Sequence, residues 1–261
     1  MLNIVVCIKV VTDPEAPVST FKIDPEKRRV LPAQGVPPVL NPYDENCLEA
    51  ALRIKDKQPA RITVISAGKD IPKAVIKKSL AVGADDLILL EDELFEDIDG
   101  YSTCRLLTAA IRKLDTYDLI LTGRMSADTN AGQVGPGIAE KMGIPCITVA
   151  QKIDVENGKA RIERVLADGL EIVECSLPCL VTISHELGEL RSANVKGLMA
   201  AQKQPFTSWQ TGDLDIDAAS INHILPLKLY IPEKEIVCDI VPGDTPEETG
   251  ANLAVKVSEI M

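Results

Sequence analysis

Residues 117–137 read YDLILTGRMSADTNAGQVGPG, and this stretch decides the fold. Its apolar start at 119–122 predicts a buried parallel strand that ends at Gly123. A polar loop follows, and a helix opens within residues 132–137. Such a turn offers unpaired backbone N–H groups and the positive end of a helix to a phosphate. A tight strand-to-helix turn that binds nothing is the alternative for this segment taken alone.

Strands and helices alternate through the first 150 residues. Asn41-Pro42 is a strong helix start, because asparagine is a preferred N-cap and proline suits the first helical position. The alternation predicts an α/β protein with a doubly wound parallel sheet and right-handed crossovers. The expected strands are 2–11, 61–67, 86–90, 119–122 and 144–149, and the expected helices start at Asn41 or span 70–82, 101–113 and 132–142.

Two segments interrupt this alternation. Residues 12–40 contain six prolines and are expected to be irregular, apart from a small hairpin formed by FKID and RRVL. Alternating polar and apolar residues around Asn157-Gly158 predict a β-hairpin addition over 152–175, with Asp168-Gly169 as a further turn. A last strand is expected at 180–184.

The C-terminal quarter has little periodicity. Residues 186–203 are expected to form a polar loop and a short helix, and a further helix is expected after Thr245. The region 204–261 offers little core of its own, which indicates an arm that packs on a partner subunit. A disordered or self-packing tail is the alternative. The expected organisation is therefore an α/β domain over 1–203 and an arm over 204–261.

The predicted topology brings separate segments to one edge of the sheet. Ligands of doubly wound sheets bind at the carboxyl ends of the strands, where the strand order reverses. The end of the first strand near Lys9, the helix start at Asn41, Ala67-Gly68 and the loop after Gly123 are expected to meet there. Their convergence favours a nucleotide site over a turn that binds nothing.

Composition limits the partners and the compartment. A formal net charge of -11 argues against nucleic acid and anionic membrane surfaces, which require a cationic footprint. No apolar run reaches the roughly 20 residues that span a bilayer, so we expect no membrane insertion and a place in the cytoplasm or an organelle matrix. The seven cysteines form no CxxC pair and are expected to be reduced and buried, without a metal site.

Several catalytic and nucleotide motifs are missing from the sequence. There is no GxGxxG fingerprint, no GxxxxGK[ST] loop, and no glycine-serine loop after the first strand of the kind that adenylating enzymes use. No nucleophile and base stand at a telling spacing, so we expect no catalytic residues. A stand-alone nucleotide sensor and an adenylating enzyme remain alternatives on the same fold.

The chain resembles the β subunit of electron-transfer flavoproteins over nearly its whole length. The segments NIVVCIKVV, GVPPVLNPYDENCLEAALRIKD, ITVISAG and AVGADDLILL occur in the order of that family. The loop GRMSADTNAGQVGP matches the family pattern GRQAIDGDTAQVGP in length. Further matches are Arg164, Asp168, Gly169 and Glu171 in the hairpin region, and Glu189 and Arg191 before the segment NVKGLM.

The resemblance implies an adenine-nucleotide hydrolase-like fold and an α subunit that holds most of an electron-carrying FAD. It also implies AMP or a second FAD at the β-subunit site, and an apolar anchor for acyl-CoA dehydrogenase-type partners on residues 194–199. The implied anchor is Val195 with Leu198 and Met199. The implied nucleotide contacts are Cys7, Lys9, Asn41, Pro42, Tyr43, Asp44, Ala67, Gly123, Arg124, Asp128, Thr129, Asn130, Ala131, Gly132, Gln133, Val134, Gly135 and Pro136.

Departures from the family pattern bear on the ligand. Asn130 replaces the second aspartate that many relatives carry in this loop, and Asp128 keeps the first. The segments NVKGLM and GVPPVLNPYD are closer to the bifurcating and nitrogen-fixation-associated branch, which favours FAD over AMP. The sequence does not identify the dehydrogenase or say whether NAD is a direct electron donor.

Overall fold

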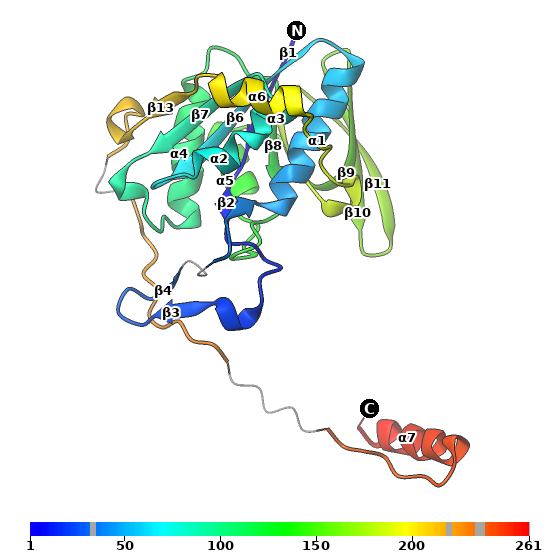
Figure 1. Cartoon of the computed structure of the whole chain (residues 1–261). Helices are drawn as coiled ribbons and strands as arrows, with labels where there is room; N and C mark the ends of the chain where they lie inside the picture. Colours follow the sequence, from blue (N-terminus) through cyan, green and yellow to red (C-terminus); the bar gives the residue numbers. More distant parts are fainter. Residues whose placement is uncertain (32–34, 218–220, 233–237, 261) are drawn as a thin grey trace. The chain divides into compact units, whose positions relative to one another are not determined.

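A nine-stranded sheet forms the centre of the chain, in the strand order β11-β10-β9-β12-β8-β1-β6-β7-β13 (Figure 1). The computed structural model describes residues 1–31, 35–217, 221–232 and 238–260. Two compact units are present, Met1–Leu227 and Lys228–Met261. The strands of the sheet are β1 (Leu2–Cys7), β6 (Ala60–Gly68), β7 (Asp86–Glu91), β8 (Leu119–Gly123), β9 (Cys146–Glu156), β10 (Lys159–Leu166), β11 (Gly169–Ser176), β12 (Cys179–Ile183) and β13 (Thr207–Trp209).

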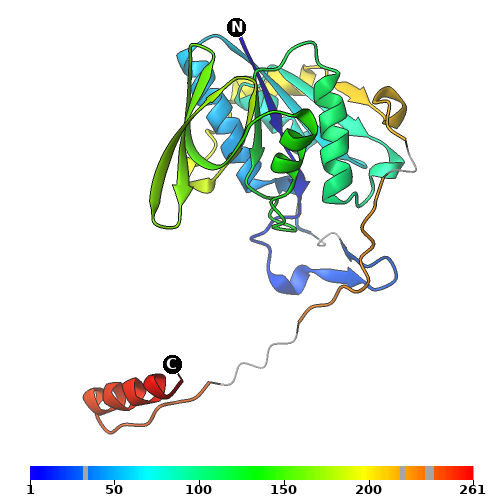
Figure 2. The ribbon, with the colours of Figure 1, turned by 180° about the vertical axis from the view of Figure 1, so that it is seen from behind.

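The parallel part of the sheet is doubly wound. The chain passes from β1 to β6 and β7, then returns to place β8 on the other side of β1, and all of these pairings are parallel. Helix α1 (Pro42–Lys57) packs on one face, whereas α4 (Gly100–Arg112) and α5 (Val134–Met142) pack together on the other (Figure 2). The expected α/β class with a mostly parallel sheet is confirmed.

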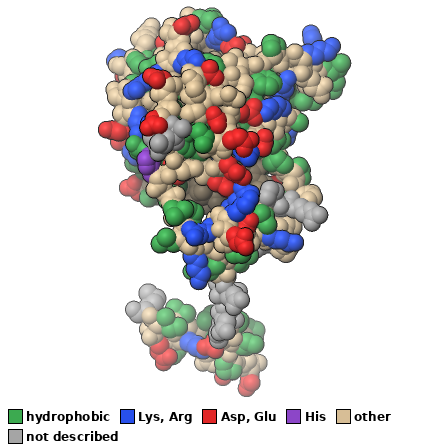
Figure 3. Space-filling model, turned by 90° about the vertical axis from the view of Figure 1, so that its left-hand side faces the viewer, with side chains coloured by type: hydrophobic (Ala, Val, Ile, Leu, Met, Phe, Trp, Pro, Cys, Tyr) green, Lys and Arg blue, Asp and Glu red, His purple; other side chains and the backbone are tan. Residues whose placement is uncertain are grey.

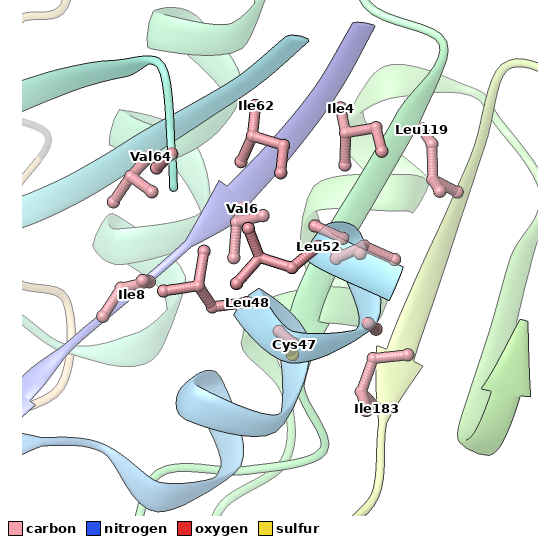
Figure 4. Packing of buried hydrophobic residues seen from close by; sticks show 14 of the residues in the cluster. Ile4, Val6, Ile8, Cys47, Leu48, Leu52, Ile62, Val64, Leu119 and Ile183 are labelled. Carbon is pink, nitrogen blue, oxygen red and sulfur yellow. The ribbon is translucent and has the colours of Figure 1, made fainter. Parts of the chain in front are cut away.

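The two faces of the sheet have separate cores. Ile4, Val6 and Ile8 of the first strand region pack with Leu48 and Leu52 of α1, all of them buried (Figure 4). The intervening residues, Val5 and Cys7, join a second cluster that includes residues of α4 and α5. Since alternate side chains of a strand point to opposite faces, one apolar run supplies both cores.

Strand β9 changes direction at Val149, which has a φ of 61°. Its first half pairs with β12, whereas the Val155 carbonyl in its second half accepts a hydrogen bond from Gln58 at the end of α1, at 2.8 Å. The Nε of Arg164 donates to the Thr148 carbonyl at 3.0 Å and holds the bend. A β-branched residue at positive φ is strained, so tertiary pairing fixes a bend that the sequence pattern does not predict.

The expected β addition is present as an antiparallel extension of the sheet. β10 pairs with β9 and with β11 in antiparallel register. Asn157 and Gly158 have φ values of 51° and 73°, the two positive values that a tight type I′ turn requires. The small hairpin expected from FKID and RRVL also forms, as β3 (Lys22–Asp24) paired with β4 (Arg29–Leu31).

The helix expected over 70–82 is two short helices, α2 (Lys73–Ile76) and α3 (Lys78–Val82). The buried Ser79 hydroxyl donates to the Ile76 carbonyl at 2.7 Å. Serine and threonine hydroxyls that bond back to the preceding turn compete with the regular helical ladder. This local bond gives a physical reason for the break at Lys77.

The compact α/β unit extends beyond the expected boundary at residue 203. β13 pairs in parallel with β7 at the edge of the sheet, and Leu214 is buried. The described residues of 204–227 therefore belong to the α/β unit and not to an arm. A three-residue strand is too short for its alternation to be recognised. In the second unit, α7 (Pro246–Ile260) forms the helix expected after Thr245.

The cysteines differ from the expectation in part. Cys7, Cys47, Cys104 and Cys179 are buried, but Cys146 and Cys238 are exposed. All seven are free thiols in the structure. Within the described ranges, no helix is both long and apolar enough to cross a bilayer.

Candidate functional site

A cavity opens where the strand order of the sheet reverses, at the carboxyl ends of β1 and β8. Chain connections leave these neighbouring strands toward opposite faces, which is the position where ligands bind to open α/β sheets. The cavity contains about 1000 Å³ of space between protein atoms, counting part of its open mouth.

Most of the predicted nucleotide contacts lie on the wall of this cavity. The end of β1, the start of α1, the end of β6 and the loop after β8 all reach it, as their place on one sheet edge predicted. The predicted residues on the wall are Cys7, Lys9, Asn41, Asp44, Ala67, Gly123, Arg124, Thr129, Ala131, Gly132, Gln133 and Val134. Pro42, Tyr43, Asp128, Asn130, Gly135 and Pro136 are outside the wall.

The start of α4, after the loop that follows β7, adds a part of the wall that sequence reasoning did not include. Asp99 caps α4 by accepting a hydrogen bond from the Ser102 N–H at 2.7 Å, and its other carboxylate oxygen accepts from the Ile224 N–H at 2.9 Å. The Asp-Gly pair at a helix start after a strand was the available signal. The additional wall residues are Ile8, Ile98, Asp99, Gly100, Thr103, Leu107, Thr122, Met125 and Ser126.

Asn41 fixes the loop after β8 from the start of α1. It occupies the N-cap position, but its side chain forms no capping bond. Instead its Nδ2 donates to the Met125 carbonyl at 3.0 Å, and its Oδ1 accepts from the Ala127 N–H at 3.0 Å. Only 1% of Asn41 is exposed. The amide therefore pairs both of its functions with backbone groups 84 and 86 residues away in sequence.

Asp44 lies one turn into the same helix start and joins two strand ends. Its Oδ2 accepts a hydrogen bond from the Lys9 N–H at 2.7 Å, and its Oδ1 accepts from the Gly123 N–H at 3.1 Å. Burial raises the pKa of this carboxyl group to about 7, although the bonds from Lys9, Asn41 and Gly123 favour the charged form. Asp44 is thus a buried acid on the cavity wall.

The loop after β8 has a backbone conformation that would let a ligand come close to its main chain. Asn130 and Gly132 have φ values of 52° and 63°. A side chain at Gly132 would also place its Cβ 3.2 Å from the Arg124 carbonyl oxygen. Helix α5 then starts at Val134 with no capping side chain and no acidic residue in its first turn. Its N-terminus can therefore offer backbone N–H groups to an anion.

Gly135 serves packing and does not face the cavity. A Cβ on this residue would lie 2.4 Å from the Thr122 Oγ1 and 2.8 Å from the Thr182 Cγ2. The helix therefore packs directly on β8 and β12 at this point. The Thr122 hydroxyl is buried without a hydrogen-bond partner in the protein, although Thr122 belongs to the cavity wall.

Two cations stand beside the loop. The Lys9 ammonium pairs with the Asp128 carboxylate. Burial alone would raise the pKa of Asp128, but the Lys9 charge and hydrogen bonds from Lys9 and Ser126 hold it below its usual value. The Arg124 guanidinium lies 5.6 Å from the centre of the Tyr43 ring. Asp128 and Tyr43 therefore act behind the wall, as partners of residues that line it.

A second candidate surface is formed by α6 (Val195–Lys203), which lies across α3 (Figure 1). The predicted anchor residues Val195, Leu198 and Met199 are 73%, 44% and 60% exposed. Gly197 allows the contact with α3, because a Cβ there would lie 2.4 Å from the Ala81 carbonyl oxygen. The apolar side chains are thus held on the surface by a close helix contact.

An ion-pair network fixes the segment before α6. Arg191 donates from Nε to one oxygen of the buried Glu49 at 3.0 Å and from Nη2 to the other at 3.1 Å. It also pairs with Asp56 at 2.8 Å. Burial tends to raise the pKa of Glu49, but the bonds from Arg191 and Arg53 hold it below the usual value.

Charge is mixed on one face of the molecule. Acidic, basic and hydrophobic side chains are interspersed on the face shown in Figure 3. The described residues on that face form no continuous basic stripe of the kind that nucleic-acid binding requires.

The sequence of this chain matches known proteins of one family. A model of the electron transfer flavoprotein domain matches residues 29–214. The subunit CarD of the caffeyl-CoA reductase-Etf complex of Acetobacterium woodii is 35% identical, over 99% of this chain and 98% of its own length. The electron transfer flavoprotein subunit beta of Clostridium acetobutylicum is 38% identical, over 84% of this chain and 83% of its own.

The same branch includes protein FixA of Azotobacter vinelandii, which is 35% identical over 84% of this chain and 79% of its own length. The family model covers β8 and the segment of α6, and the match to CarD covers 99% of this chain. The chain therefore belongs to the electron transfer flavoprotein family, as a β-type subunit of the branch that includes FixA and CarD.

Proposed function

We propose that this chain binds an adenine nucleotide, FAD or AMP, in the cavity between β1 and β8. The chain would act as the β subunit of a heterodimeric carrier that passes electrons between an acyl-CoA dehydrogenase-type flavoenzyme and a second redox partner. The observation that best supports this proposal is the position of the cavity. It lies at the switch point of the sheet and beside the uncapped N-terminus of α5.

The wall fits the parts of an adenine nucleotide. Cys7 and Ala67 offer small apolar contacts for adenine, and the backbone of residues 131–134 offers donors for a phosphate. Asp128 and Asn130 would orient the sugar or phosphate from behind the wall. A bound flavin would supply the electron-accepting chemistry, and these residues would bind and orient it.

The α subunit is the proposed partner of the second unit. Helix α7 has no buried residue, and its apolar side chains Leu253, Val255 and Ile260 are 50%, 61% and 81% exposed. Exposed apolar side chains of this kind mark interaction surfaces. Residues 228–261 would therefore pack on the α subunit, which would hold most of the electron-carrying FAD.

The dehydrogenase is the proposed partner of α6. Val195, Leu198 and Met199 would insert into an apolar recess of the flavoenzyme, because exposed anchors contribute most when a partner desolvates them. The rigid contact of Gly197 with α3 would present these anchors at a fixed position.

The decisive experiment counts nucleotides in the complex. The chain is co-expressed with its α subunit, purified under mild conditions, and assayed for FAD and AMP per heterodimer. Two FAD indicate flavin at the β-subunit site, and one FAD with AMP indicates AMP there. A heterodimer with neither nucleotide at the β-subunit site would remove the proposal. A stable monomer that binds AMP without flavin would favour a stand-alone sensor.

A further inference from the structure

One carboxylate connects the two strand ends that form the cavity. The pairing of β1 with β8 ends at Val6 and Leu121, so the strands have separated where the cavity begins. Beyond this point Asp44 accepts backbone hydrogen bonds from Lys9 at 2.7 Å and from Gly123 at 3.1 Å. Asp44 therefore bridges the strand ends where the backbone ladder no longer joins them.

We propose that Asp44 is a positioning residue whose ionised carboxylate sets the spacing of the Lys9 and Gly123 backbones, and whose protonation weakens nucleotide binding. The inference rests on the proposed nucleotide site, and it adds a proton dependence that the site alone does not require. Lys9 and Gly123 both lie on the cavity wall, so a change in their spacing changes the wall itself.

The chemistry of the carboxyl group explains the effect of a proton. An ionised carboxylate only accepts hydrogen bonds, and both of its oxygens here face backbone donors. A proton on either oxygen adds an O–H donor beside the backbone donors and makes that oxygen a poorer acceptor, so one of the two bonds is weakened. Burial already disfavours the charged form and raises the pKa to about 7, which brings this change into the neutral range.

The ionisable neighbours of Asp44 come from three elements. Cys7 of β1 and Cys47 of α1 are buried thiols whose pKa values burial and the Asp44 charge raise well above the usual value. The Lys9 ammonium faces Asp128, whose pKa is lowered, and the Arg124 guanidinium lies on the same cavity wall. Of the four groups with shifted pKa values, only Asp44 changes its charge near pH 7.

The expected change in nucleotide affinity with pH follows from the ionised fraction of Asp44. With a midpoint near 7, roughly nine-tenths of Asp44 is ionised at pH 8 and roughly one-tenth at pH 6. If only the ionised form is competent, apparent affinity scales with this fraction. Nucleotide binding should therefore weaken about tenfold between pH 8 and pH 6 through this group.

The first test is calorimetric titration of the full-length chain with AMP at pH 8 and pH 6. Asp44→Asn cannot accept both bonds at any pH, so it should bind at least tenfold more weakly at pH 8 and lose the extra pH dependence. Glu45→Gln is the matched control, because it removes a carboxylate from the same helix turn outside the cavity wall. The AMP phosphate also titrates near pH 6. This contribution is the same for the wild type, Asp44→Asn and Glu45→Gln, so it cancels when they are compared. An Asp44→Asn variant with wild-type pH dependence would overturn the proposal.

The second test needs no nucleotide. The ¹⁵N amide shifts of Lys9 and Gly123 in the full-length wild-type chain should titrate together with a midpoint near 7, because both amides donate to Asp44. Flat shifts between pH 6 and pH 8 would overturn the role of Asp44, even if AMP binds. Failure of the wild type to bind AMP would instead remove the proposed function, and the amide titration would still decide whether Asp44 senses a proton.

Discussion

The cavity at the ends of β1 and β8 and the exposed face of α6 are built in opposite ways. The cavity depends on buried polar side chains, since Asn41 and Asp44 are 1% and 6% exposed and bond to distant backbone groups. The α6 face is apolar and exposed, and Val195 is 73% exposed. The cavity is therefore inseparable from the fold, whereas the α6 face can be altered without disturbing it. Four substitutions test this difference.

Gly135→Val should have the largest effect. Its side chain would collide with the Thr122 Oγ1, which lies 2.4 Å from the position of a Cβ, so α5 must move away from β8. Overpacking of this kind destabilises by about 3 kcal/mol and should also abolish nucleotide binding. Urea unfolding and nucleotide content measure both effects. Gly169→Val is the control, because no atom lies within 4 Å of a Cβ at Gly169; equal stability of the two variants would contradict the packing argument.

Asn41→Ala should follow. It removes the two bonds to Met125 and Ala127 and leaves these backbone groups without their partner in a half-buried position. The expected loss is about 2 kcal/mol of unfolding free energy. AMP affinity should fall by more than tenfold, because the loop beside the cavity loses its attachment to α1. Calorimetry at 25 °C and chemical denaturation check the prediction, and unchanged affinity would show that Asn41 supports only the fold.

Arg191→Met should have a smaller effect that depends on pH. Glu49 is buried, and its pKa is held below 4.5 by Arg191 and Arg53 against the effect of burial. The pair therefore stabilises the fold fully above the unfolded pKa, and this contribution is lost as the pH falls through the folded pKa. Because Arg191 is 35% exposed, we expect a loss of only about 1–2 kcal/mol at pH 7.

The melting temperatures of wild type and Arg191→Met should converge as the pH is lowered from 7 toward 3. Arg61→Met is the matched control, since Arg61 pairs with Asp86 in an exposed position and should change stability by less than about 0.5 kcal/mol. A difference between wild type and Arg191→Met that grows on acidification would contradict the assigned direction of the Glu49 pKa shift.

Val195→Asp should have the smallest effect on the chain itself. Because Val195 is 73% exposed, its replacement should change the unfolding free energy by less than about 0.5 kcal/mol. Electron transfer from the dehydrogenase should nevertheless fall by at least tenfold, with nucleotide content unchanged. Gln202→Asp, at another exposed position of α6, is the control for added charge. A parallel loss of nucleotide would mean that Val195 is structural and that the two regions are coupled.

Much of the parallel sheet could be predicted from local pattern. The Asn41-Pro42 start of α1, the strand from Leu119 and the turn at Asn157-Gly158 all carry residues whose intrinsic preferences agree with the fold. The same strand ends brought twelve predicted residues to one cavity. The wall contributed by Asp99 and Gly100 was missed, because the start of the helix after β7 had not been placed on that edge.

What the sequence alone determined is the alternation of strands and helices, the sheet edge that forms the site, and the family. Periodicity and turn residues act over a few positions, and they can be recognised without knowledge of the partner strand. The tertiary structure alone decided that Asn41 clamps a loop, that Asp44 joins two strand ends, that β9 bends at Val149, and that β13 completes the sheet. Each depends on groups far apart in sequence, whose hydrogen bonds form only after the chain has folded.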